Sequence, residues 1–245
     1  MPTKRAASVP RLLLALWSAP RSRSTAFERM MMERGDMAVL HEPFSHVIDF
    51  GATIVGRRRV STETDLLAAL QGLEGRTFFK DTTDFRYPEL LTHKQFLRDT
   101  MHTFIIRHPQ EVIASHARLN PRLECAEVGI SRLHEIYAAV AEASGRRPLV
   151  VDSDDLLERP AETVAAYCRH VGIPFIAESL HWQPGTPAQW ERTSRWHQGA
   201  SDSAGFLRRS PGNQPLPALD GRLARYCEFH LPHYEELRKH RMLLA

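Results

Sequence analysis

Cysteine is scarce in this sequence. Only Cys125, Cys168 and Cys227 occur among the 245 residues, and no two of them are separated by just two positions. Three widely spaced cysteines exclude a framework of paired disulfides and a zinc site built on cysteine pairs. Free cysteines are typical of proteins that work in a reducing compartment, so we expect a cytoplasmic location.

Lysine is also rare, because 28 of the 32 basic residues are arginine (32 Lys+Arg less the four lysines). The lysines are Lys4, Lys80, Lys94 and Lys239, and Lys80 stands out because it ends an otherwise apolar run. The formal net charge is only +3. Such a mild excess does not indicate a nucleic-acid partner, and we expect none.

Long hydrophobic runs are missing. The apolar run at residues 12–17 follows Lys4 and Arg5, which gives it the look of a secretory signal, but it is six residues long and begins directly after Arg11. A signal needs about 7–15 apolar residues and a membrane span about 20. We therefore interpret this run as a buried first strand and expect no association with a membrane.

What the sequence contains is an alternation of short apolar runs and amphipathic stretches. Strands are predicted over residues 12–17, 37–41, 76–80, 102–107 and 148–152. Helices are predicted over residues 25–34, 62–73, 109–119, 133–143 and 161–171, the first with Ser24 or Thr25 near its N-cap. This order predicts an α/β fold, a three-layer sandwich with a central parallel sheet.

We expect residues 1–245 to form a single domain. Residues 183–215 hold four prolines and four glycines and show little periodicity, so they are expected to form a lid-like loop. Residues 219–245 are expected to form a C-terminal helical segment, interrupted near Pro232.

The loop after the first strand has the composition of an anion site. Ser18-Ala-Pro-Arg-Ser-Arg-Ser-Thr25 joins that strand to a helix N-terminus, where backbone N–H groups and the helix dipole favour negative charge. Arg21 offers a guanidinium fork, and Ser22, Ser24 and Thr25 offer hydroxyl groups. The loop has neither the glycines nor the lysine of a nucleoside-triphosphate loop, which disfavours Mg·ATP chemistry. An ordinary serine-rich turn with a capping serine remains the alternative.

A second anion site is predicted where the strand over residues 102–107 meets the next helix. Arg107 ends the strand, and Ser115 lies eight positions further on, about two turns into the helix. One phosphate group fits between the arginine fork and the serine hydroxyl.

Together the two sites resemble the sulfotransferases that use 3′-phosphoadenosine 5′-phosphosulfate (PAPS), closest to the bacterial branch and to proteins named aminotransferase-like. The motifs are P-R-S-x-S-T after an early strand and R-x-P-x-x-x-x-x-S after a later one. The resemblance implies that the first loop is P-loop-like and holds the 5′-phosphosulfate, through Pro20, Arg21, Ser22, Arg23, Ser24 and Thr25. It implies that Arg107 and Ser115 hold the 3′-phosphate.

Two later passages extend the resemblance. The stretch from Val151 to Phe175 matches the family's acidic, proline-containing passage, and Trp196-His197 with Ser203-Ala-Gly-Phe206 matches the loop that closes over the nucleotide. Ser203, Gly205 and Phe206 are thereby implied to touch the nucleotide, with Arg208 or Arg209 in place of that loop's lysine. The first loop departs from the family at Arg23, where a glycine is usual. A positive φ at that position would strain an arginine.

The resemblance implies in-line transfer of a sulfuryl group from PAPS, leaving 3′-phosphoadenosine 5′-phosphate (PAP), with Lys80 and Arg21 stabilising the developing charge. No metal is expected, since the 13 histidines are scattered. The histidine that serves as base in one branch is replaced by Thr82. Glu42, after the second strand, is the first choice for the general base, and we expect burial to raise its pKa. His41, His46 and Asp81 are the alternatives.

Three functions stay open at this level. The first is sulfuryl transfer to a hydroxyl or amine of a small molecule, such as an alcohol, phenol or amine of bacterial secondary metabolism. The second is a non-catalytic relative that binds PAP, and the third is a small-molecule kinase on a modified P-loop. The acceptor pocket is expected to be shaped by residues 43–60, 82–98, 116–135 and 183–200. The sequence carries no signal of oligomeric state.

Overall fold

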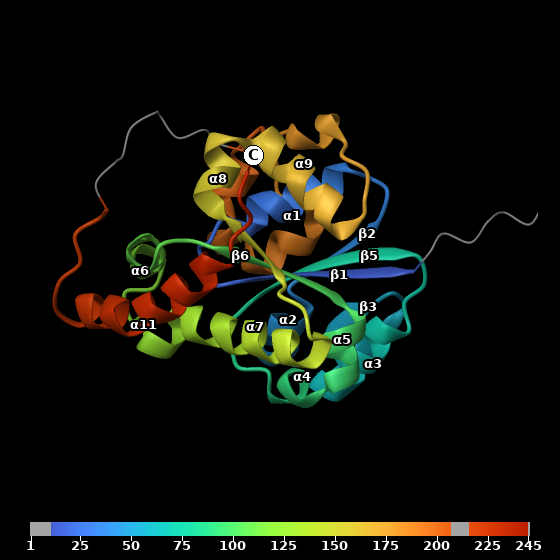
Figure 1. The fold of residues 1–245 in the computed structure, drawn as a ribbon, viewed down its shortest axis with the longest axis horizontal. Helices are drawn as coiled ribbons and strands as arrows, with labels where there is room; N and C mark the ends of the chain where they lie inside the picture. Colours follow the sequence, from blue (N-terminus) through green and yellow to red (C-terminus); the bar gives the residue numbers. More distant parts are fainter. Residues whose placement is uncertain (1–10, 207–215, 245) are drawn as a thin grey trace, which may run out of the picture.

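The computed structural model describes residues 11–206 and 216–244. Its centre is a five-stranded parallel sheet in the order β2-β5-β1-β6-β7, drawn across the middle of Figure 1. The strands are β1 (Leu12–Ser18), β2 (Ala38–His41), β5 (Arg76–Thr82), β6 (Met101–Ile106) and β7 (Leu149–Asp152). All five strands were predicted, and the α/β fold with a central parallel sheet is confirmed.

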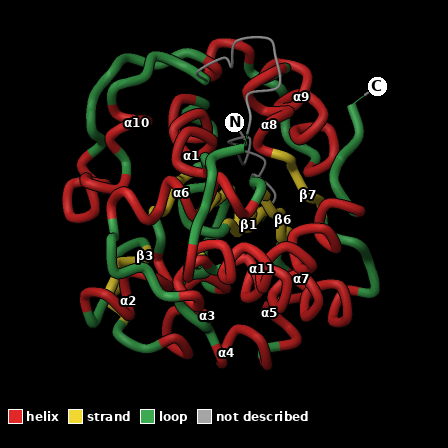
Figure 2. Tube along the Cα trace, turned by 90° about the vertical axis from the view of Figure 1, so that its left-hand side faces the viewer, coloured by secondary structure: helices red, strands yellow, loops and turns green. Residues whose placement is uncertain are grey.

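The two faces of β1 explain the layers, because successive side chains of a strand point to opposite faces. Leu13, Ala15 and Trp17 join one buried apolar cluster, whereas Leu14 and Leu16 join the other. The second cluster is completed by α1 (Ser24–Glu33) and α9 (Pro160–Val171). Helices therefore cover both faces of the sheet, as Figures 1 and 2 show.

The first cluster is covered by a larger set of helices. They are α2 (Pro43–Phe50), α3 (Glu63–Gln71), α4 (Pro88–Thr92), α5 (Lys94–Asp99), α7 (Ile130–Ser144) and α11 (Gly221–Lys239). The helix α6 (Pro109–Leu119) adds Val112 and Ile113 to the same cluster. Further helices are α8 (Ser153–Glu158) and the short turns η1 (Cys125–Val128) and η2 (Ala177–Leu180). Among the described residues, no helix is long and apolar enough to cross a membrane.

The structure differs from the expectations from the sequence in three places. Pro232 does not interrupt the last helix, because α11 runs unbroken from Gly221 to Lys239 and packs against α6 and α7. Packing of its apolar side outweighs the cost of a proline inside a helix. The segment after β2 contains elements that were not predicted, namely α2, with Pro43 in its first turn, and then a hairpin of β3 (Thr53–Val55) and β4 (Arg58–Val60).

The third correction concerns residues 183–215, which were expected to form a loop. The described part contains η3 (Ala188–Trp196) and α10 (Gln198–Ser201). These short helices satisfy backbone groups locally, so the segment covers the sheet edge as structured chain. Arg208 and Arg209, suggested as substitutes for a nucleotide-loop lysine, lie outside the described residues.

The strand order places a switch point at β1. The next two strands of the sheet along the chain, β2 and β5, lie on one side of β1, and the following two, β6 and β7, lie on the other side. In open parallel sheets, ligands bind in the crevice beyond the carboxyl ends of the strands at such a point. Ser18, His41, Thr82, Ile106 and Asp152 end the five strands at this edge.

Candidate active site

A cavity of about 420 Å³ opens at the carboxyl edge of the sheet. It is lined by most of the residues that the sequence singled out, namely Pro20, Arg21, Ser22, Arg23, Ser24, Thr25, Glu42, Lys80, Arg107, Ser203 and Gly205. His41, Ser115 and Phe206 are buried and are not part of its wall. The fold thus gathers residues from five separate stretches of sequence around one space.

The backbone is strained where it borders this cavity. Arg21, Arg23 and Glu42 have φ values of 65°, 67° and 43°, and they are the only non-glycine residues with positive φ in the described chain. All three line the cavity. Left-handed conformations at non-glycine residues cost on the order of 1–3 kcal/mol each and cluster at functional sites. The departure at Arg23, where a glycine was expected, is therefore a real local strain.

Arg23 is held in that conformation by its side chain. Its guanidinium group pairs with Asp154 at 2.6 Å and with Glu111 at 3.3 Å, and it donates to Ser153 Oγ at 2.9 Å. These bonds tie the loop to α6 and α8, so the side chain offsets the strain in the backbone. Arg23 is also the N-cap of α1, without a side-chain capping bond. Ser24 and Thr25 are the first two residues of α1 and lie next to this N-cap, as predicted.

The serine and threonine hydroxyl groups of the loop have different partners. Ser24 Oγ accepts a hydrogen bond from Ser18 Oγ at 2.8 Å, and Thr25 Oγ1 lies 3.1 Å from His197 Nδ1. Ser22 Oγ is fully buried and has no hydrogen-bond partner among the described residues. A buried hydroxyl without a partner is costly, so this atom marks a place for a polar ligand.

The predicted second anion site lies directly against the first loop. Arg21 Nε donates to Ser115 Oγ at 3.2 Å, and Arg107 donates to the carbonyl oxygen of Arg21 at 2.8 Å. Arg107 also pairs with Glu111 at 2.8 Å. The loop and α6 are therefore one connected unit, in which the guanidinium groups of Arg21 and Arg107 line the cavity.

The segment after η2 closes the cavity from the outside. Arg21 also donates to the carbonyl oxygen of Trp196, and Thr25 contacts His197, so the loop after β1 is bonded to η3 and to the residue that follows it. Ser203 Oγ accepts from Trp182 Nε1 at 3.1 Å, and the Phe206 ring packs edge-on against Trp182 at 5.4 Å. Phe206 thus supports the wall rather than forming it.

A buried row of charges crosses the floor of the cavity. Lys80 forms an ion pair with Glu42 Oε1, Glu42 Oε2 lies 3.5 Å from His41 Nε2, and His41 Nδ1 lies 2.9 Å from Glu28 Oε2. Burial alone would raise the pKa of Glu42, but Lys80 and His41 outweigh it and hold that pKa well below its usual range. The expected raised pKa was wrong because the sequence did not show these two cations beside Glu42.

The alternatives to Glu42 have less access to the cavity. Burial and the charge of Glu42 raise the pKa of Asp81 to about 7. The Asp81 carboxylate accepts hydrogen bonds from the backbone N–H groups of Phe44 and Ser45, so it caps α2 from below and is not part of the cavity wall. Burial lowers the pKa of His46 to about 4, and this ring too lies outside the wall.

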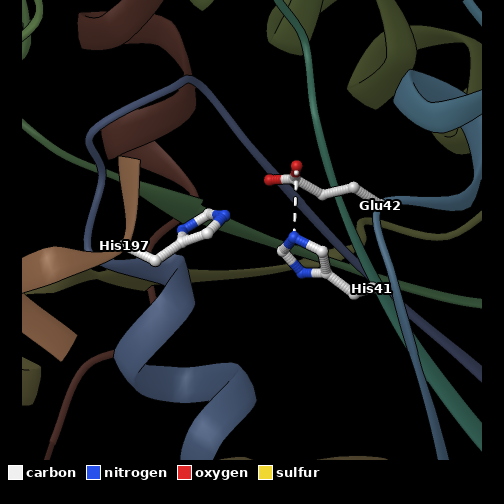
Figure 3. A group of neighbouring side chains, drawn as sticks. All are labelled: His41, Glu42 and His197. Carbon is white, nitrogen blue, oxygen red and sulfur yellow. Dashed lines mark ion pairs between the residues drawn. The ribbon is translucent and has the colours of Figure 1, made fainter. Parts of the chain in front are cut away.

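Two of the scattered histidines meet at this floor. Single ligand atoms of His41, Glu42 and His197 lie within 4.8 Å of one another, close enough to surround a cation (Figure 3). The Lys80 ammonium group already contacts Glu42, and a divalent cation would lie against that charge. The positive charge beside the Glu42 carboxylate is therefore provided by Lys80, and we propose no metal ion at these three residues.

Comparison with known proteins agrees with this geometry. The model of the sulfotransferase domain matches residues 12–240. The chain belongs to the sulfotransferase family. Branched-chain-amino-acid aminotransferase-like proteins 2 and 1 of Arabidopsis thaliana are both 27% identical to it, over 238 and 240 residues. The match covers 91% of this chain but 41% of each relative, so the chain spans about two fifths of their length.

A solved structure shares the fold of this sulfotransferase. The sulfotransferase from Alicyclobacillus acidocaldarius superimposes with a TM-score of 0.52 at 13% identity, covering 96% of this chain and 98% of that one. At this identity the likeness concerns the fold alone.

Glu28 and Thr193 were not predicted as members of the site, and His197 was named only as part of the loop that closes over the nucleotide. Thr193 Oγ1 lies 3.3 Å from His41 Nε2 and 3.0 Å from His197 Nε2, which links η3 to the row of charges. For Glu28 a signal was present. It stands between Ser24 and Met31 at helical spacing on the buried side of α1, where a lone carboxylate needs a partner.

Proposed function

We propose that this sulfotransferase transfers a sulfuryl group from PAPS to a hydroxyl or amine of a small-molecule acceptor. The observation that carries the proposal is the unpartnered Ser22 Oγ within a strained loop at the N-terminus of α1. Backbone N–H groups at a helix N-terminus and a free buried hydroxyl suit a phosphosulfate group. The guanidinium groups of Arg21 and Arg107 at the same cavity supply the opposite charge.

When bound, PAPS supplies the sulfuryl group, and its 5′-phosphate is the leaving group. The acceptor oxygen or nitrogen bonds to sulfur while the bond from sulfur to the bridging phosphate oxygen breaks, and that oxygen keeps the electron pair. Glu42 takes the proton of the acceptor, and Lys80 and Arg21 stabilise negative charge on the transferred group and the phosphate. Arg107 and Ser115 hold the 3′-phosphate of the nucleotide.

In this proposal Lys80 has two partners. Without a donor its ammonium group pairs with Glu42, and a sulfuryl group in the cavity competes for the same ammonium group. As Lys80 turns to the donor, Glu42 loses its nearest cation, and burial then raises its pKa toward the range of a useful base. The low pKa of Glu42 in the ligand-free site is thus compatible with a role as base.

The test is thermal melting of the purified chain with PAP and, separately, with Mg·ATP, followed by PAP release from PAPS with a panel of simple phenols, alcohols and amines. A ligand at about 100 times its Kd adds roughly 2.7 kcal/mol to the free energy of unfolding, which shifts the midpoint clearly. We expect a shift with PAP and turnover of PAPS.

Other outcomes point to the other functions. A shift with PAP but no turnover with any acceptor class would indicate a non-catalytic relative that binds the nucleotide. A shift with Mg·ATP alone would indicate a kinase. No shift with either ligand would remove the nucleotide assignments of the two anion sites.

A further inference from the structure

The row of charges at the cavity floor continues into the interior of the protein, to Glu28. Its carboxylate is fully buried in α1 and is not part of the cavity wall. Both of its oxygens lie at His41 Nδ1, at 3.0 Å and 2.9 Å, and among the described residues the carboxylate makes no other hydrogen bond. The surrounding positions Phe27, Met30 and Met31 are buried and apolar.

An apolar side chain would suit this position on packing grounds alone. A lone carboxylate in such a place is costly unless a hydrogen-bonded partner offsets the loss of water. Its presence is therefore explained by its effect on His41.

Glu28 determines how the His41 ring is oriented and protonated. Because the carboxylate accepts at Nδ1, that nitrogen carries a proton, and Nε2 is left to face Glu42 Oε2 at 3.5 Å and Thr193 Oγ1 at 3.3 Å. Figure 3 shows the His41 ring directed at the Glu42 carboxylate, with the His197 ring beside both of them. A second proton, on Nε2, makes His41 a cation beside the oxygen of Glu42 that Lys80 does not contact.

The charged and titratable groups that face His41 come from five places: Glu28 in α1, Glu42 at the start of α2, His46 within α2, Lys80 in β5 and His197 after η3. Burial lowers the pKa of His41, but the two carboxylates outweigh burial, and the net shift is upward. With His41 protonated, Glu28, His41, Glu42 and Lys80 alternate in sign and balance in charge.

We propose that Glu28 is a positioning residue for sulfuryl transfer, which holds His41 so that Nε2 supports the Glu42 carboxylate on the oxygen that Lys80 leaves free. The inference rests on the proposed function. Once Lys80 turns to the donor, His41 is the cation that remains beside Glu42. It keeps Glu42 ionised until the acceptor arrives, because a protonated carboxyl group cannot take the acceptor's proton.

The test is Glu28→Gln, which keeps the shape of the side chain and an acceptor for Nδ1–H but removes the charge. We expect kcat for PAP release from PAPS to fall at least about tenfold while the Kd of PAP stays unchanged. His41 then loses its second proton at lower pH. In a plot of kcat against pH, the decline on the alkaline side should therefore shift to lower pH by about one unit. Glu28→Asp restores the carboxylate and should return this decline toward its original position.

The matched control is Glu33→Gln on the same helix, which breaks an ion pair with Arg29 at the surface and should change neither kcat nor the position of the decline. A wild-type profile in Glu28→Gln would overturn the proposal. So would a loss of kcat that is equal at every pH and is not rescued by Glu28→Asp, because a merely structural role predicts that result.

A second measurement covers the case in which Glu28→Gln does not fold. In the wild-type chain, an NMR titration of the His41 ring, assigned by comparison with His41→Gln, should give a pKa above the ordinary value of about 6.5. A pKa at or below that value would overturn the proposal without any assay of turnover. If the pKa is raised but no acceptor is sulfated, the proposed function fails, and with it the role of Glu28 in transfer, while the pairing itself stands.

Discussion

Lys80 and Glu42 form a buried ion pair where β5 and β2 end side by side in the sheet. The backbone prepares this contact, since His41 is opposite Lys80 in the parallel register and Glu42 N–H donates to the Lys80 carbonyl oxygen at 2.8 Å. Breaking a buried pair by removing one partner costs about 3–5 kcal/mol, because the other charge stays buried. The same two residues therefore affect both the free energy of unfolding and the proposed transfer step.

Glu42→Gln should abolish most turnover and leave the nucleotide site intact. Removing a general base lowers kcat by about 100- to 10,000-fold. The affinity for PAP should stay close to that of the wild type, because Glu42 does not belong to either anion site. The measurements are kcat at saturating PAPS and calorimetric titration with PAP. Retained kcat would transfer the base role to His41, His46 or Asp81.

Lys80→Met should lower the free energy of unfolding, and the loss should shrink when Glu42→Gln is added. The single variant leaves the Glu42 carboxylate buried beside His41 only, whereas the double variant removes both charges of the pair. Urea unfolding of the wild type, the two single variants and the double variant gives the coupling energy between Lys80 and Glu42, which we expect to be at least about 1 kcal/mol. Additive losses would mean that the pair is not formed in solution.

In assays of turnover, Lys80→Met should reduce kcat more than it reduces the affinity for PAPS.

The strands of the sheet could be predicted because each is a short apolar run that ends at polar residues. The helix α2 was not predicted, although a proline such as Pro43 is common in the first turn of a helix. The continuity of α11 through Pro232 depends on packing against α6 and α7, which a local pattern does not contain.

The site was predictable where it follows a strand and hidden where it depends on contacts between distant segments. The loop after β1, Lys80 near the end of β5 and Arg107 after β6 lie at the edge where these strands end, so their convergence was expected. The contacts of His41 with Glu28 and Thr193 join α1, β2 and η3, and no spacing in one sequence shows them. Roles for these residues, the use of PAPS, the acceptor and the single domain over 1–245 stay predictions.

Arg107→Ala should weaken the binding of PAP while leaving adenosine 5′-phosphate almost unaffected, since the second ligand has no 3′-phosphate. A hydrogen bond to a charged group contributes about 1.5–3 kcal/mol, which corresponds to roughly a 10- to 150-fold change in Kd. Arg86→Ala, which removes an exposed arginine paired with Glu135, is the control and should change neither affinity. Equal weakening of both ligands would mean that Arg107 acts on the loop, through its bond to the Arg21 carbonyl oxygen.

Treatment with a chelator should leave PAP release from PAPS unchanged, because the Lys80 ammonium group provides the positive charge at Glu42. The measurement compares kcat before and after dialysis against EDTA, with metal content followed by elemental analysis. A loss of turnover that added Zn²⁺ restores would assign a metal to His41, Glu42 and His197 instead.

His102 should make the free energy of unfolding depend on pH. The ring is buried between Trp17 Nε1, which donates to Nδ1 at 2.9 Å, and the Phe96 carbonyl oxygen, and burial lowers its pKa to about 4. Because the folded pKa is below the unfolded value of about 6.5, the unfolded chain binds the proton first. Stability from the neutral ring is therefore present above pH 6.5 and is lost as pH falls toward 4, by roughly 3 kcal/mol at 1.36 kcal/mol per pKa unit.

Urea unfolding at pH 7 and pH 4.5 tests this dependence. The His102→Gln variant should be less stable than wild type at pH 7, because it disturbs the bond from Trp17, but its loss of stability on acidification should be smaller. His170→Gln, at an exposed position near the end of α9, should behave as wild type at both pH values. An unchanged difference between the two pH values in His102→Gln would mean that other buried histidines, such as His116 or His46, whose pKa values burial also lowers to about 4, carry the acid sensitivity.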